Sequence, residues 1–119
     1  MAKERLNEIE FSTLYDLDME RAILSSILQN NDTLGEIFDT IKAKDFYLKG
    51  HSQIYEAMVE CLNSDDPVAV PFLKNKLGDK YDEALMIDII GTNSLIDIRR
   101  YASELKEKSI KRSLVKIAH

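Results

Sequence analysis

The chain has 119 residues, a mass of 13.6 kDa and a formal net charge of −5, with 45% apolar and 31% charged residues. This is the size of one ordinary globular domain, and it excludes a second domain of full size. A single cysteine, Cys61, excludes an internal disulfide, and no apolar run approaches the roughly 20 residues of a membrane span. Residues 1–10 are rich in charge and do not resemble a secretory signal, so we expect a soluble protein of the cytoplasm.

Four glycines and two prolines leave few residues for tight turns, which favours helices over hairpins and predicts an all-α fold. The first predicted helix begins at Asp16, a good N-cap, and ends near residues 30–31. A capping box at 33–36 predicts a short second helix, and the aromatic residues of 45–50 are expected to fill the core from a loop. Further helices are predicted at 51–62, from Pro71 to Gly78, at 80–90, and from Ser94 to the end of the chain.

The last predicted helix is longer than the rest of the domain can cover. At about 1.5 Å per residue it would extend roughly 39 Å, whereas a compact domain of this length is about 35 Å across. Its apolar stripe also changes face, because the residues around Ile98 lie roughly 130° from those that follow residue 109. We therefore expect the second half to meet a second chain or sequence beyond residue 119. A kinked or shorter helix near Ser109 is the alternative.

Motifs for catalysis or cofactor binding are not found in the sequence. The glycines are isolated and none precedes a Lys-Ser or Lys-Thr pair, so no phosphate-binding loop is predicted. His51, His119 and Cys61 lack the spacing of metal ligands. We expect His51 to anchor the start of a helix and Cys61 to be buried on an apolar stripe, and Asp65 and Asp66 to lie in a solvated turn. No catalytic, cofactor-binding or metal-binding residue is predicted.

The charge is unevenly distributed along the chain. Residues 1–98 carry 19 acidic and 9 basic side chains, a net charge of −10, whereas residues 99–119 carry 7 basic and 2 acidic side chains, a net charge of +5. An acidic body repels phosphate and is a poor nucleic-acid platform. The basic side chains are spread around the last helix, which favours a solvated helix end over a phosphate-binding face. From the residues alone we predict an all-α interaction module.

Three segments carry recognisable motifs. The first is residues 16–24 followed by the small residues Ser25-Ser26. The most specific is Asp45-Phe46-Tyr47 followed by His51, Ile54-Tyr55 and Met58. The third is residues 101–115, with Tyr101-Ala102, Leu105, Glu107-Lys108, Arg112 and Leu114-Val115. In this order, over residues 16–119, they resemble the opening helix, the central signature and the long last helix of the N-terminal domain of bacterial replicative DNA helicases of the DnaB type.

The resemblance implies a non-catalytic domain of a hexameric helicase ring, with a flexible tail at 1–15, a compact helical bundle at 16–78 and a C-terminal helical hairpin at 79–119. Implied partners are a second copy, in dimers within the ring, and the helicase-binding domain of primase; DNA would be contacted only by the full-length ring, and no membrane is implied. ATP and magnesium would belong to a motor domain after residue 119. A free-standing helical adaptor or regulatory module is the alternative. We expect the partner-binding residues to be Tyr101, Leu105, Ile110, Leu114, Val115 and Ile117.

Overall fold

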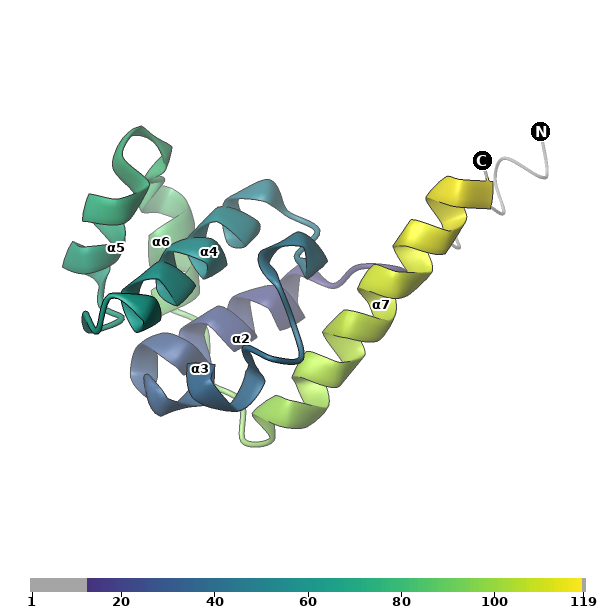
Figure 1. The fold of residues 1–119 in the computed structure, drawn as a ribbon, viewed down its shortest axis with the longest axis horizontal. Helices are drawn as coiled ribbons and strands as arrows, with labels where there is room; N and C mark the ends of the chain where they lie inside the picture. The colour runs from purple at the N-terminus through teal and green to yellow at the C-terminus, as the bar shows by residue number, and fades with distance from the viewer. Residues whose placement is uncertain (1–12, 119) are drawn as a thin grey trace.

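The computed structural model describes residues 13–118, and for residues 117 and 118 it describes the backbone only. Most of the tail expected at 1–15 therefore lies outside the described residues. Six α-helices and two short 3-10 helices make up the regular structure of the described part, as the all-α prediction requires. In chain order they are α2 (Leu17–Gln29), α3 (Asp32–Ile37), η1 (Ala43–Asp45), α4 (Lys49–Asn63), α5 (Val70–Leu77), η2 (Gly78–Lys80), α6 (Glu83–Ile90) and α7 (Ile98–Ala118) (Figure 1).

Several helix ends follow the predicted local chemistry. The Asp16 side chain caps α2 by accepting a hydrogen bond from the Met19 amide, 3.0 Å away. Pro71 lies in the first turn of α5, where the missing N–H costs nothing. Gly78 ends α5 with a φ of 55°, a conformation that residues with a side chain rarely adopt.

Other helix ends differ from the prediction because side chains from distant segments bind there. The capping box at 33–36 is not formed, and α3 begins at Asp32 after Asn31. The amide of Asn31 bonds the Ile27 and Val68 carbonyls and accepts from the Val68 N–H, which joins α2 to the α4–α5 connection. Helix α7 begins at Ile98 instead of Ser94, because the preceding link is held in a non-helical path by two serines of α2.

Helix α2 lies at the centre of the fold and packs against α3, α4, α6 and α7. Its apolar residues Ile23, Leu24 and Ile27 are fully buried in one hydrophobic core that every helix except the 3-10 turns enters. Tyr55 of α4 crosses this core and donates a hydrogen bond of 2.9 Å to the Ile41 carbonyl. Burial, and to a smaller extent the nearby Asp45 carboxylate, raises the pKa of the Tyr55 hydroxyl above its ordinary value.

Helix α7 projects from the rest of the domain, and the whole molecule measures 49 × 30 × 25 Å along its principal axes (Figure 1). It runs without interruption through Ser109, so the alternative of a shorter helix is wrong. Within residues 79–118, α6 and α7 each pack against α2. The link at 91–97 carries the chain across α2, so the bundle at 16–78 and the last two helices form one core. No helix of the described part is long and apolar enough to cross a bilayer.

Candidate partner interface

The two halves of α7 are attached to the body by different interactions. Ile98, Ala102 and Leu105 of the first half enter the hydrophobic core, and all three are buried. No residue from 106 to 116 belongs to that core. We call residues 106–118 the α7 arm. If the face of Leu105 is continued along the helix, it meets Ser109 and Arg112, which are both buried polar residues.

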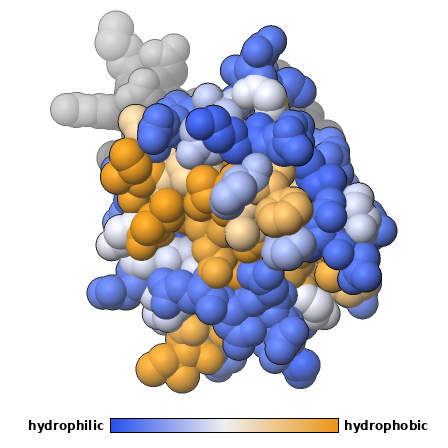
Figure 2. Space-filling model, turned by 90° about the vertical axis from the view of Figure 1, so that its left-hand side faces the viewer, coloured by the Kyte–Doolittle hydropathy of each residue, from blue (hydrophilic) through white to orange (hydrophobic). Residues whose placement is uncertain are grey.

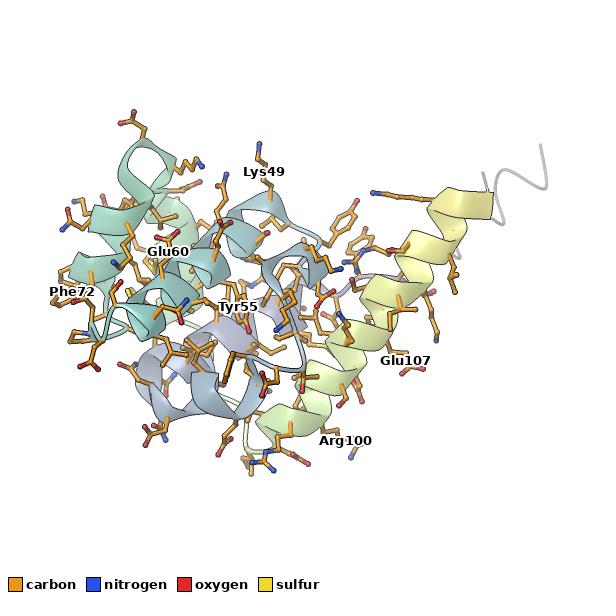
Figure 3. The ribbon with its side chains drawn as sticks, viewed as in Figure 1. Lys49, Tyr55, Glu60, Phe72, Arg100 and Glu107 are labelled. Carbon is orange, nitrogen blue, oxygen red and sulfur yellow. The ribbon has the colours of Figure 1, made fainter. Side chains whose placement is uncertain are left out.

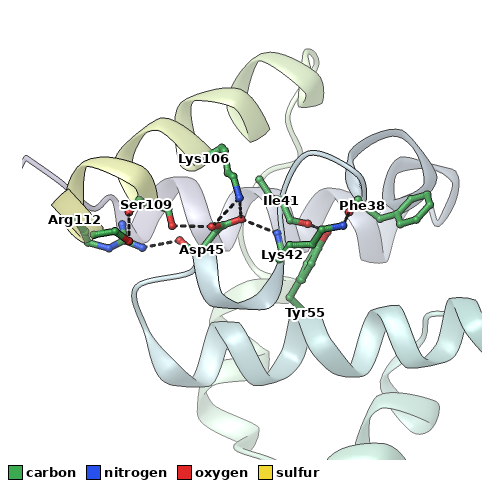
Figure 4. Close-up of polar contacts among 9 residues, drawn as sticks. Phe38, Ile41, Lys42, Asp45, Tyr55, Lys106, Ser109 and Arg112 are labelled. Atoms are coloured by element: carbon green, nitrogen blue, oxygen red, sulfur yellow. Dashed lines mark hydrogen bonds and ion pairs between the residues drawn. The ribbon is translucent and has the colours of Figure 1, made fainter. Parts of the chain in front are cut away.

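A carboxylate of the body, Asp45, binds the first turn of the α7 arm (Figure 4). The Ser109 hydroxyl donates a hydrogen bond of 2.7 Å to Asp45 Oδ1, and Lys106 Nζ lies 3.3 and 3.2 Å from the two carboxylate oxygens. The Lys42 amide donates to Asp45 Oδ2 at 2.7 Å, which fixes the 3-10 turn that holds the carboxylate. Asp45 is only 1% exposed, so these contacts form in a medium where charge-assisted hydrogen bonds are strong.

Arg112 attaches the next turn of the α7 arm. Its guanidinium donates to the carbonyls of Leu14 and Asp45, at 2.7 Å in both cases, and lies 5.5 Å from the centre of the Tyr47 ring. Tyr47 in turn stacks on Tyr15, with 4.2 Å between the ring centres. Arg112 is 7% exposed, so the expectation that the basic end of the chain is simply solvated is wrong for this residue. One planar side chain thus connects three segments far apart in the sequence.

The side of the α7 arm away from Ser109 and Arg112 carries two apolar residues that are open to solvent. Ile110 is 51% and Leu114 61% exposed. Together with Lys44 of η1 and Lys106 they line a groove between the 3-10 turn and the arm, which we call the α7 groove. Arg100 and Glu107 project from α7 into solvent (Figure 3). The change of apolar face predicted from the sequence is therefore real: the stripe is buried up to Leu105 and exposed beyond it.

The six residues expected to bind a partner have different positions in this structure. Ile110 and Leu114 are exposed on the arm, whereas Leu105 is fully buried against its own chain and is unavailable to a partner in this conformation. Tyr101 is partly buried and packs on the core, and Val115 is partly buried. The side chain of Ile117 lies outside the described part. Of the six, Ile110 and Leu114 are thus the residues whose side chains are exposed on the arm.

A family model described as "DnaB-like helicase N terminal domain" matches residues 12–107. This chain belongs to that family. Two relatives, both named "Replicative DNA helicase DnaB", come from Synechocystis (26% identical over 111 residues, 87% of this chain) and Helicobacter pylori (27% over 104 residues, 86% of this chain). This DnaB-like domain spans only 13% and 21% of the length of these two proteins.

Solved structures of the family have the same fold. The N-terminal domain of DnaB helicase from Helicobacter pylori, in a study that also concerns its interactions with primase, superposes with a TM-score of 0.82 at 25% identity, over 92% of this chain and 89% of that one. The corresponding domain from Mycobacterium tuberculosis gives a TM-score of 0.77 at 22% identity, over 86% and 79% of the two chains. The all-helical architecture is therefore that of the DnaB N-terminal domain.

A second buried polar cluster in this DnaB-like domain joins α2 to the start of α4. The Glu20 carboxylate, which is fully buried, accepts hydrogen bonds from the amides of Tyr47 (2.7 Å) and Leu48 (3.3 Å) and bonds His51 Nδ1 (2.9 Å). His51 therefore anchors the beginning of α4, as the sequence predicted, while its Nε2 has no hydrogen-bond partner. Within residues 13–118, no three His, Cys, Asp or Glu side chains are grouped so that they could hold a metal ion.

A second exposed apolar surface was not predicted from the sequence. On α6, Ile87 is 60% and Ile90 55% exposed, whereas Met86 and Ile89 are buried. Figure 2 shows apolar residues gathered on the end of the molecule where α5 and α6 lie, among hydrophilic ones. The signal was present in the sequence, because four of the last five residues of α6 are apolar and a helix on the surface of a bundle can bury only one side.

Proposed function

We propose that this DnaB-like domain is the N-terminal part of a replicative DNA helicase subunit, where it mediates assembly of the subunits into a ring and recruits primase. The observation that carries the assembly role is the projecting α7 arm, which holds Ile110 and Leu114 away from the core of its own chain. The names of the two relatives support the helicase assignment, and the primase study of the Helicobacter pylori domain supports the recruitment role. DNA unwinding with ATP and magnesium is assigned to the rest of the subunit.

Exposed apolar residues at these positions favour association. Burying a Leu or Ile side chain is worth about 1.5–3 kcal/mol relative to leaving it in water. The two side chains lie about one helical turn apart, and Asp45 and Arg112 hold the arm that carries them in a fixed direction. A preorganised surface of this kind binds with little loss of conformational entropy, which suits a contact between subunits.

The assembly role is tested with Leu114→Asp in the helicase subunit that contains this chain. We expect the mass measured by sedimentation velocity to fall below that of the wild-type ring, because a carboxylate replaces an apolar contact. Ser103→Asp is the matched control, since it adds the same charge at an exposed position of α7 and should leave the mass unchanged. An unchanged ring for Leu114→Asp would refute the assembly role of the arm.

The recruitment role is tested by titrating this chain with the C-terminal domain of the cognate primase in a calorimeter. At about 100 μM of each protein, a complex with a Kd near 100 μM is detected. A heat of binding that saturates at a fixed molar ratio of primase to this domain supports recruitment. No binding at this concentration would show that the domain alone does not recruit primase.

A further inference from the structure

We propose that the outer face of α6 is a docking surface for a basic amphipathic helix of a partner protein. The inference goes beyond the assembly and recruitment roles proposed above and does not depend on them. It starts from Ile87 and Ile90, which are 60% and 55% exposed and do not belong to the hydrophobic core. Figure 1 places α6 at the end of the molecule away from the α7 arm.

The exposed face of α6 has a narrow apolar centre. At about 100° per residue, Ile87 lies roughly 60° from Ile90 on one side and roughly 60° from the small residue Ala84 on the other. All three are exposed, whereas Met86 and Ile89 on the remaining side are buried. A small residue beside two large ones leaves a shallow groove, and such grooves accept a ridge of side chains from another helix. The shape of this face therefore suits a helix that lies across α6.

Helix α6 is held in place by its first turn. Asp82 caps the helix by accepting a hydrogen bond of 3.1 Å from the Leu85 amide. The Leu85 side chain fits closely against Gly50 of α4, where an added Cβ atom would collide with Leu85 Cδ2. The exposed face is therefore preorganised, and binding a partner requires little further ordering of this chain.

The charge around this face is negative. Residues 79–91 contain four acidic side chains and one basic side chain, a net charge of −3. Glu83 lies between the two isoleucines on the helix surface, and Asp88 borders them. Within residues 13–118 neither carboxylate forms an ion pair. Both carboxylates are therefore available to a cationic partner.

The two lysines of α5 have partners outside α6. Lys76 Nζ lies 3.3 Å from Asp66, and Lys74 Nζ lies 5.3 Å from the centre of the Tyr81 ring. Neither lysine binds a carboxylate of α6, so the negative charge of the exposed face is not neutralised from α5.

A basic amphipathic helix fits both properties of this face. Its apolar side chains, spaced at i and i+3 or i+4, would cover Ile87 and Ile90, and flanking lysines or arginines would approach Glu83 and Asp88. A second copy bound face to face would instead bring the carboxylates of two α6 helices together, and like charges in contact oppose association. The structure therefore favours a different chain of opposite charge.

A contact of this size should be weak and sensitive to salt. One helix on two exposed isoleucines buries far less than the roughly 1,600 Å² of a standard stable interface. We expect a Kd on the order of 100 μM for a short helical peptide. Because the charges on this face are exposed, the affinity should fall as the ionic strength rises.

The docking surface is tested with a defined probe. The probe is a fluorescein-labelled peptide of about 18 residues, or five helical turns, built from leucine and lysine with leucine on one face. Fluorescence anisotropy with the wild-type chain at up to about 1 mM should show saturable binding. Ile87→Asp should weaken binding about tenfold or more, although it adds a charge that attracts the peptide.

Two controls separate the apolar and the charged contributions. Ser103→Asp adds the same charge at an exposed position of α7 and should not weaken binding of the lysine peptide. A peptide with glutamate in place of every lysine should bind the wild-type chain about tenfold more weakly or less well still. Ile90→Asp is a second variant of the same face, and circular dichroism verifies that each variant is folded.

Three results would overturn the docking surface. The lysine peptide might show no saturable binding to the wild-type chain at 1 mM, in which case the face does not dock such a helix. Binding that is equal for the wild type, Ile87→Asp and Ile90→Asp would place the peptide elsewhere on the chain. Equal binding of the glutamate peptide would show that charge does not select the partner. All three outcomes leave the mass of the helicase ring, which tests the assembly role, unaffected.

Discussion

Replacement of Arg112 by alanine should both destabilise the domain and release the α7 arm. The guanidinium makes two hydrogen bonds of 2.7 Å to backbone carbonyls, and only 7% of the residue is exposed. A hydrogen bond from a charged donor contributes about 1.5–3 kcal/mol, and water replaces part of that when the side chain is removed. We therefore expect Arg112→Ala to lower the free energy of unfolding by about 3 kcal/mol.

Two measurements separate the global effect from the local one. In a domain of this size, each kcal/mol corresponds to about 4 °C in the melting temperature, so Tm should fall by about 12 °C. Hydrogen exchange at the amides of 110–116 should accelerate about a hundredfold, since each 1.4 kcal/mol corresponds to a factor of ten. Arg100→Ala is the matched control, because that side chain is 74% exposed and its ion pair with Glu104 contributes little. A loss no larger than that of the control would refute the structural role of Arg112.

Three further predictions concern the buried groups and one turn. Glu20→Ala should cost about 3 kcal/mol or more in a urea titration, because it leaves the buried amides of Tyr47 and Leu48 without an acceptor; a loss below about 1 kcal/mol would contradict this account. Burial raises the pKa of the Cys61 thiol, so a thiol reagent at pH 8 should label the native chain far more slowly than the unfolded chain, and equal rates would count against burial. Gly78→Ala should lower stability by about 1 kcal/mol in thermal unfolding, because φ is 55° there, and an unchanged Tm would show that the turn relaxes.

The fold class and most helices followed from spacing and local caps. Asp16, Pro71 and Gly78 act at the helix ends where the sequence places them. The start of α7 was missed by four residues, because it depends on the serines of α2 that bond the link, and such contacts between distant segments leave no local pattern. The packing of both α6 and α7 on α2 depends likewise on contacts between distant segments, which leave no local pattern.

The candidate interface was predicted in part. The change of face along α7 identified Ile110 and Leu114 as unused by the core, and they are exposed. The burial of Ser109 and Arg112 was not recognised, because charged and hydroxyl residues in a basic helix normally indicate a solvated side, and no local pattern marks Asp45 of the 3-10 turn as their partner. Their register carried the signal: Ser109 and Arg112 continue the buried face of Leu105, and a polar residue at such a position requires a polar partner.

Because polar contacts attach the α7 arm to the body, temperature and added solutes should affect the attachment of the arm differently from the stability of the core. Apolar packing weakens on cooling, whereas hydrogen bonds such as those of Ser109 and Arg112 do not depend on the hydration of apolar surface. Guanidinium ions have the same planar donor geometry as the Arg112 side chain and compete for the same oxygens. Low concentrations of guanidinium chloride should therefore detach the arm while the core remains folded. Urea at the same concentration is planar but uncharged, and sodium ions carry no N–H donor, so neither should compete as strongly for these oxygens. A specific solute should therefore be able to release the arm while the hydrophobic core of the domain stays folded.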